Sequence, residues 1–249
     1  MDLPPDFLLF VAIGFAAQLV DGALGMAYGV TASTLLIGFG VPPAVSSATV
    51  HAAECFTTGA SAISHRAFGN IDRALFRRLL LPGMLGAAIG AYALGNIDGD
   101  ALKPWIAGYL AVMGVLILAK SMHKVIVPRE VVRHVPALGF FGALMDAIGG
   151  GGWGPIVASN LLMRGHEFRL TVGSVNAVEF FVTMTASAVF LLTLGTFHLW
   201  MVAALAIGGV AAAPFGAWLV RHINARLMMR VVGLLVIGLS LRTLYQALS

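Results

Sequence analysis

Long apolar segments that carry almost no charge are the feature of this sequence that most restricts its fold. A helix needs about 20 apolar residues to cross a bilayer, and six segments come close to that length. They are Ala44–Ser64, Leu79–Leu94, Leu102–Ala119, Val172–Leu194, Met201–Val220 and Leu227–Leu248. Only 10% of the residues are charged and 59% are hydrophobic, whereas a soluble domain carries about 25% charged residues. The long segments lack the alternation of strands, so we expect an all-α integral membrane protein.

Two further apolar regions, 7–39 and 135–163, are interrupted by glycine near their centres. The first contains Asp21-Gly22-Ala23-Leu24-Gly25, and the second contains Gly149-Gly150-Gly151-Gly152-Trp153-Gly154-Pro155. As one helix, the first region would be about 50 Å long, which exceeds the thickness of a bilayer. Each glycine costs a helix interior about 1 kcal/mol relative to alanine. We therefore predict that each region forms two half-helices joined at a glycine break.

The two broken regions are copies of one another. Thirteen of the 45 positions from 14 to 58 carry the same residue as the position 125 further along the chain. These identities include the pairs Asp21/Asp146, Gly25/Gly150 and Glu54/Glu179. Such self-similarity indicates a duplication. We expect a first repeat at 1–120, a linker at 121–134 and a second repeat at 135–249, all within one membrane domain.

Basic residues gather in four loops, at 65–78, 120–133, 164–169 and 221–230. Loops rich in Lys and Arg usually lie on the cytoplasmic side of a membrane. All four loops reach that side if each broken region is a re-entrant hairpin and each repeat has three full crossings. The odd number of crossings then makes the two repeats inverted, with a cytoplasmic linker and both termini outside. Eight continuous transmembrane segments are the alternative.

Inverted repeats with broken helices are typical of secondary transporters, whose substrate binds near the midplane at the breaks. A half-helix exposes unpaired N–H groups and the positive end of its dipole, and together these attract an anion. The second half-helices are predicted to start at about 25–29 and 151–154, and Pro155 suits a first helical position. We therefore expect a small anion at these breaks. The alternative is that the glycines only allow close helix packing.

Polar side chains follow each break at helical spacing. In the first repeat they are Ser47, His51, Glu54, Thr58 and Ser61, and in the second they are Ser174, Asn176, Glu179, Thr183 and Ser187. An ionisable group in a bilayer costs at least about 2.5–3.5 kcal/mol and usually faces a cavity or a partner. Glu54 and Glu179 are therefore candidate proton carriers, since a buried carboxyl can stay neutral near pH 7; neutral ties between helices are the other interpretation. His51 is either a ligand or a packed histidine.

Asp21 and Asp146 conflict with an anion site, because a carboxylate repels an anion. We expect each to accept hydrogen bonds from N–H groups of the glycine turn or of the following half-helix; a role in gating or proton coupling is the alternative. The net charge of +4 comes from the loops and favours membrane orientation over nucleic-acid binding. The sequence contains no zinc spacing, nucleotide loop or nucleophile motif. We therefore expect no cofactor, no bound metal and no enzymatic activity.

These residues resemble the sulfite exporter family TauE/SafE, also called the toluene sulfonate uptake permeases. The resemblance rests on the break at 149–155 and on two further segments, Thr171-Val172-Gly173-Ser174-Val175-Asn176 and His65-Arg66-Ala67-Phe68-Gly69-Asn70-Ile71-Asp72. It implies movement of sulfur-containing anions such as sulfite, sulfonates or sulfoacetate across the bacterial cytoplasmic (inner) membrane. It also implies anion contacts from the second repeat at Gly149, Gly150, Gly151, Gly152, Ser174 and Asn176. The matching candidates in the first repeat are Gly25, Ser47 and Thr49.

The preferred interpretation is a multi-pass transporter of the alternating-access type. Its partners are expected to be a small anionic substrate, the lipid bilayer and, if uptake is coupled, protons; a homodimer is a further option. The alternative from another class is an ion channel or cation-binding transporter. In that case Asp21, Asp146, Glu54 and Glu179 would coordinate the ion.

Overall fold

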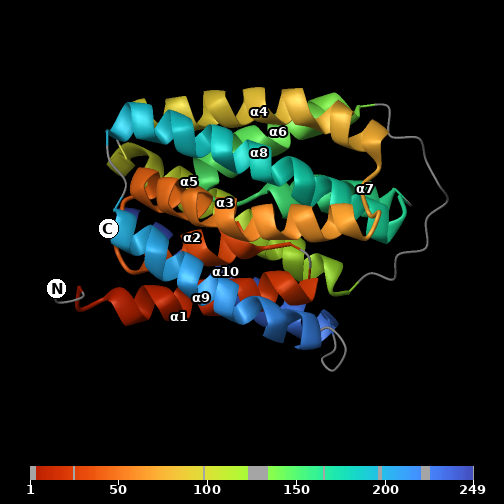
Figure 1. Ribbon diagram of the computed structural model, residues 1–249. Coiled ribbons are helices and arrows are strands. Elements are labelled where there is room, and N and C mark those ends of the chain that lie inside the picture. The colour runs from red at the N-terminus through yellow and green to blue at the C-terminus, as the bar shows by residue number, and fades with distance from the viewer. Residues whose placement is uncertain are drawn as a thin grey trace.

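A computed structural model describes residues 4–24, 26–97, 99–122, 134–164, 166–195, 198–219 and 225–248 (Figure 1). Over these ranges the protein is a bundle of α-helices with one π-helical turn and no strands. The all-α prediction is therefore confirmed. Helix α1 begins and helix α10 ends at the same end of the bundle, near the two marked termini in Figure 1.

The first half of the chain has a short hairpin followed by three long helices. The hairpin consists of α1 (Phe7–Leu24) and α2 (Tyr28–Gly38), and the long helices are α3 (Pro43–Ala67), α4 (Arg73–Asn96) and α5 (Gly99–Lys120). Proline fits the start of α3, because the first residue of a helix has no partner for its N–H. Asp72 caps α4 by accepting hydrogen bonds from the backbone N–H groups of Ala74 and Leu75.

The second half repeats this order. Its hairpin consists of α6 (Val135–Gly149), a π-helical turn η1 (Gly154–Ala158) and α7 (Ser159–Met163). The long helices are α8 (Phe168–Leu194), α9 (Leu199–Leu219) and α10 (Ala225–Leu248). Both predicted glycine breaks are confirmed, since helical structure stops between α1 and α2 and again between α6 and η1. Each of the six predicted long segments coincides with one long helix.

Helices of each half pack against helices of the other half, in matching pairs. Helix α1 packs against α9, and its counterpart α6 packs against α4. Helices α5 and α10 pack against each other, as do α3 and α8. This is the pairing expected of a duplicated chain whose halves interlock. The inverted orientation of the repeats, their boundaries and the cytoplasmic linker remain predictions; most of the linker lies outside the described residues.

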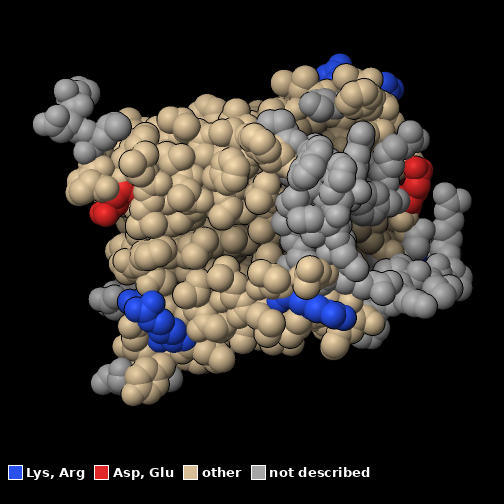
Figure 2. Space-filling model, turned by 90° about the horizontal axis from the view of Figure 1, so that it is seen from below, with Lys and Arg blue, Asp and Glu red and all other residues tan. Residues whose placement is uncertain are grey.

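Four helical segments are long and apolar enough to cross a membrane: Arg73–Asn96, Ala101–Lys120, Leu170–Leu194 and Met229–Gln246. Their outer faces are apolar, as in α4, where Leu81, Leu85, Ile89 and Tyr92 are exposed at helical spacing. The face of the molecule in Figure 2 is mostly uncharged, with only a few Lys, Arg, Asp and Glu side chains. These observations agree with a multi-pass protein whose apolar surface faces lipid.

The N-terminal half of the polar helix α3 lies inside this apolar shell. Ser46, Ser47, Thr49, His51 and Glu54 are buried there, and α3 packs against α8 from the other half. Because α3 carries these polar groups, its burial places hydrogen-bonding and ionisable side chains beside the two breaks. The centre of the bundle is therefore the polar part of the molecule.

Candidate functional site

The two chain breaks touch each other in the centre of the bundle. A Cβ atom built on Gly29 would lie 2.8 Å from Cα of Gly151 and 2.9 Å from the carbonyl oxygen of Gly150. A Cβ on Gly151 would overlap the backbone nitrogen of Val30. Only glycine allows two backbones to approach this closely. The hairpin of the first half is therefore in backbone contact with the hairpin of the second.

An aspartate caps the second helix of each hairpin. Oδ1 of Asp21 accepts a hydrogen bond from the backbone N–H of Tyr28 at 3.3 Å, and Oδ1 of Asp146 accepts one from Trp153 at 2.9 Å. Both contacts span seven residues, so the two breaks have the same local design. The predicted capping contact is confirmed for both aspartates. One N–H at the start of each second helix is consequently already paired with a carboxylate.

Hydroxyl groups satisfy the carbonyls of the second break. Ser33 donates to the carbonyl oxygen of Gly150, Tyr109 to that of Gly151 at 2.9 Å, and Ser47 to that of Ala147 at 2.6 Å. These donors come from α2, α5 and α3, all in the first half. Ser47 is predicted from the sequence, but Ser33 and Tyr109 are not, since single hydroxyls on ordinary helices carry no motif. Side chains of the first half thus stabilise the break in the second half by hydrogen bonds to its carbonyl groups.

Gly150 has a left-handed backbone conformation, with φ of 68°, and Ser33 fills the space where its side chain would be. Gly149 and Gly152 face the ring and the hydroxyl of Tyr109 in the same way. In the first break, Ala27 has φ of 105°, a region that L side chains rarely adopt. The positive φ in the first break is therefore at an alanine and causes local backbone strain, whereas the positive φ in the second break is at a glycine, which adopts it without strain.

His51 joins α3 to the end of α6. Its Nδ1 lies 2.8 Å from the carbonyl oxygen of Ser47, and its Nε2 lies 3.1 Å from Oδ2 of Asp146. A carbonyl only accepts hydrogen bonds, so Nδ1 carries a proton. The contact with Asp146 then needs one further proton, on either Nε2 or Oδ2, because otherwise two acceptors would face each other. His51 and Asp146 therefore form a buried pair that holds one shared proton.

Glu54 lies beside the contact between the two breaks, and Glu179 interacts electrostatically with Asp21 and Asp146. Glu54 is only 4% exposed, and its Oε1 would lie 3.2 Å from a Cβ on Gly29. Glu179 is half-buried on α8. Glu54 interacts electrostatically with Glu179, Asp146 and Asp21. The four acidic residues predicted from the sequence therefore influence one another electrostatically.

The other predicted anion contacts lie in different surroundings. Ser174 on α8 accepts a hydrogen bond from the backbone N–H of Asp72 at 2.8 Å, so its hydroxyl is engaged at the turn between α3 and α4. Thr49 is buried on α3, and Asn176 is half-buried on α8. Gly25 lies outside the described residues. The anion-binding roles of all these residues remain predictions.

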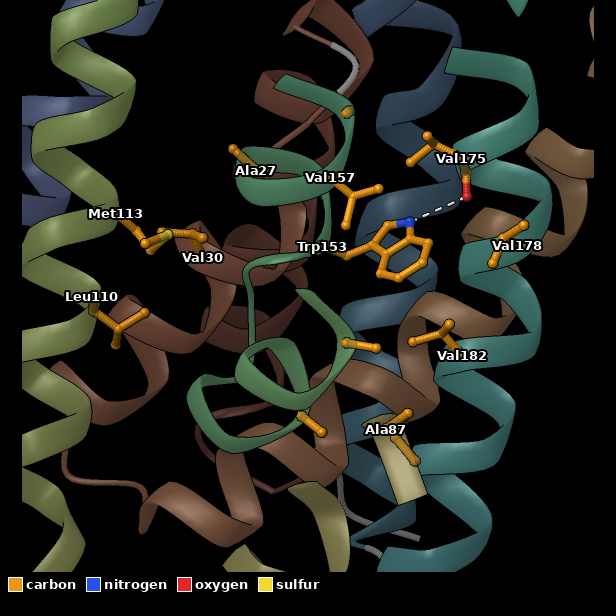
Figure 3. Packing of buried hydrophobic residues seen from close by; sticks show 14 of the residues in the cluster. Ala27, Val30, Ala87, Leu110, Met113, Trp153, Val157, Val175, Val178 and Val182 are labelled. Atoms are coloured by element: carbon orange, nitrogen blue, oxygen red, sulfur yellow. Dashed lines mark hydrogen bonds between the residues drawn. The ribbon is translucent and has the colours of Figure 1, made fainter. Parts of the chain in front are cut away.

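Trp153 anchors the second break to α8. Its side chain is fully buried, and its Nε1–H donates to the carbonyl oxygen of Val175 at 3.2 Å. Figure 3 shows the ring facing α8, beside Val175, Val178 and Val182. Tyr28 occupies the equivalent place in the first break, where its hydroxyl is buried without a hydrogen-bond partner. The first break is thus less firmly fixed than the second.

Comparison with known proteins gives a consistent match. A family model described as Sulfite exporter TauE/SafE matches residues 10–243. The chain is 42% identical over 248 residues to a Bacillus subtilis (strain 168) protein named "Probable membrane transporter protein YtnM", covering 95% of this chain and 82% of the relative. No solved structure matches the chain.

Proposed function

Since the chain belongs to the sulfite exporter TauE/SafE family and is a membrane transporter of that type, we propose that it carries a small sulfur-containing oxyanion or an organosulfonate. Sulfite and sulfoacetate are the leading candidates. The substrate crosses the bacterial cytoplasmic membrane by alternating access, and it binds where the two hairpins touch. The backbone contact of Gly29 with Gly150 and Gly151 is the observation that carries this proposal.

An anion suits this place for a physical reason. The helices α2 and η1 both begin at the two chain breaks. The start of a helix offers N–H groups and a partial positive charge. In the conformation described, Asp21 and Asp146 accept from the first of these groups. The substrate therefore competes with two carboxylates of the protein for the same donors. Binding of substrate and loosening of these caps are linked in this mechanism.

A second proton, taken up by the pair of His51 and Asp146 beyond the one they share, provides the link to pH. This proton makes Asp146 neutral, and a neutral carboxyl accepts a hydrogen bond more weakly than a carboxylate. The N–H of Trp153 is then released more easily to the anion. Glu54 and Glu179, which interact electrostatically with Asp21 and Asp146, exchange protons with this site in the same mechanism. Proton binding and anion binding therefore favour each other.

The membrane potential determines when such coupling is needed. Moving one charge through 100 mV is worth about 2.3 kcal/mol. A divalent oxyanion therefore leaves a negative-inside cell with a gain of about 4.6 kcal/mol. Export needs no proton, whereas uptake against this potential needs about two. The acidic cluster offers enough carboxyls for uptake with two protons.

Flux into proteoliposomes tests the proposal. Purified protein is reconstituted, and uptake of radiolabelled sulfite or sulfoacetate is followed at several concentrations and at two pH values, with empty liposomes as the control. We expect uptake that saturates and that competes with unlabelled sulfonates. An unsaturable cation current without anion flux would replace the proposal with the channel interpretation. The electrostatic interaction of Glu54 with three other carboxyls favours that second interpretation. Within the described residues, however, no three His, Cys, Asp or Glu side chains are grouped so that they could hold a metal ion.

A further inference from the structure

Lys120, at the end of α5, reaches both hairpins. Its Nζ donates to the carbonyl oxygen of Pro155 at 3.1 Å and to the hydroxyl of Ser159, both in the second hairpin. It also lies 3.9 Å from the sulfur of Met26, in the break between α1 and α2. The hydroxyl of Ser159 lies 3.5 Å from the same sulfur. One ammonium group therefore contacts the break of the first half and the π-helical turn of the second.

Among the described residues, the groups that this ammonium group contacts are neutral. Its acceptors are a carbonyl, a hydroxyl and a thioether, and within the described ranges no carboxylate lies within ion-pair distance of Nζ. Lys120 is also half-buried. A positive charge that is partly removed from water without a negative partner is costly. An anion that arrives beside it would remove that cost.

The position of Lys120 along α5 separates it from the central contact. Tyr109, which donates to Gly151, stands eleven residues earlier on the same helix. Eleven residues of helix rise about 16 Å. The backbone of Lys120 is therefore well away from the Tyr109 contact, toward one end of the bundle, and its long side chain reaches back to the hairpins. A π-helical turn such as η1 often marks a functional site.

We infer that Lys120 recognises the negative charge of the substrate as the anion enters or leaves between the two hairpins, an inference that rests on the proposed function. In the absence of substrate the ammonium group holds η1 and the first break together through Pro155, Ser159 and Met26. When an oxyanion arrives, its oxygen atoms replace these neutral acceptors. Lys120 thus selects for anions and releases the two hairpins at the same step.

Substitutions of Lys120 separate charge recognition from a purely structural role. The variants are Lys120→Met, Lys120→Gln and Lys120→Arg, with Ser159→Ala as the matched control that removes one acceptor and keeps the charge. Transport is measured with the dianion sulfoacetate and the monoanion methanesulfonate, and KM and kcat are determined separately. The melting temperature of each variant without anion reports whether it folds.

We expect Lys120→Met and Lys120→Gln to raise KM for sulfoacetate by about tenfold, the size of one lost charge-assisted contact, with a smaller rise for methanesulfonate. Lys120→Arg keeps the charge and should raise KM less than Lys120→Gln does, and Ser159→Ala should also raise KM less than Lys120→Gln does. Unchanged KM in folded Lys120→Gln, or an equal rise for both anions, would overturn the inference and leave Lys120 a structural tie. If the wild-type protein transports neither anion, the proposed function itself fails. Wild-type transport with an unaffected Lys120→Gln variant removes only the role of Lys120.

Discussion

Nε2 of His51 and Oδ2 of Asp146 lie 3.1 Å apart, and this contact connects the polar helix of the first half to the broken helix of the second. The other nitrogen of the ring donates to the carbonyl of Ser47. Because the second oxygen of Asp146 accepts from Trp153, one carboxyl group is shared between a histidine and the start of a helix. A change at the histidine is therefore transmitted directly to the break.

Replacing Asp146 by asparagine tests this transmission. The asparagine oxygen can still accept from Trp153, and its amide can donate to neutral His51, but the side chain no longer takes up a proton. We expect Asp146→Asn to fold with a melting temperature close to wild type and to transport at a rate that depends less on pH than the wild-type rate. The initial rate of sulfite uptake at pH 6 and pH 8 checks this. A wild-type pH profile in Asp146→Asn would contradict proton uptake by Asp146.

The alanine variant at the same position measures how much the hydrogen bonds of Asp146 contribute to stability, apart from its role in proton coupling. Asp146→Ala leaves the N–H of Trp153 and Nε2 of His51 buried without partners, and an unsatisfied buried group costs about 1–3 kcal/mol. We expect a clear loss of stability in Asp146→Ala. Thermal unfolding in detergent measures it, with Asp146→Asn as the matched control. Equal melting temperatures in the two variants would show that the hydrogen bonds of Asp146 contribute little.

The contact between the breaks predicts which glycines tolerate a side chain. Gly151→Ala would push a methyl group into the backbone of Val30, so we expect it to abolish saturable transport and to lower the melting temperature. Gly108 on α5 is a matched control, since a Cβ there meets no atom within 4 Å. Gly108→Ala should be neutral or stabilising by up to about 1 kcal/mol. Full transport by Gly151→Ala would rule out a site that depends on close approach of the two hairpins.

Much of this architecture is encoded in local sequence. The glycines from Gly149 to Gly152 and the proline after them specify the second break, because a helix that contains four glycines in a row is costly. The repeated aspartate predicts the capping contact at both breaks. Neither prediction needs long-range information, since each aspartate and its N–H partner are only seven residues apart in the sequence.

The contacts between halves depend on tertiary packing and are not readable in the same way. Ser33, Tyr109 and Lys120 sit on ordinary helices, and only the fold brings them to the second hairpin. Equivalent positions in the two repeats do not have equivalent surroundings. Ser174 corresponds to Thr49 by its position in the repeat, yet its hydroxyl contacts the backbone of Asp72. A sequence motif therefore predicts the type of residue at a position but not its neighbours.

Glu179 tests the role of the acidic cluster. It is half-buried on α8 and interacts electrostatically with Asp21 and Asp146. Glu179→Gln keeps the shape of the side chain and removes its proton exchange, so we expect anion binding near wild type and loss of proton-coupled uptake. Anion binding is measured by thermal shift, and proton movement by a pH-sensitive dye inside the vesicles. Proton movement that persists with anion uptake in this variant would remove Glu179 from the mechanism.

The strained backbone of Ala27 predicts a side-chain size limit at the first break. Glycine adopts φ of 105° without penalty, whereas a β-branched residue there is strongly disfavoured. We expect Ala27→Gly to change stability by no more than about 1 kcal/mol, because relief of strain offsets the lost methyl group and the added freedom of the unfolded chain. Ala27→Val should be destabilised by about 2 kcal/mol or more. The melting temperatures of the two variants measure this difference. An Ala27→Val protein as stable as wild type would show that the backbone of Ala27 is not strained.

The location of the bound anion is the most direct test of where this transporter works. Selenite has the shape and charge of sulfite, and its selenium atom gives an anomalous signal in a crystal of the wild-type protein. We predict one strong peak between the two hairpins, in contact with the backbone from Gly150 to Trp153 and near the start of α2. A strong selenium peak elsewhere in the bundle, with the two hairpins still packed together and empty between them, would contradict the account.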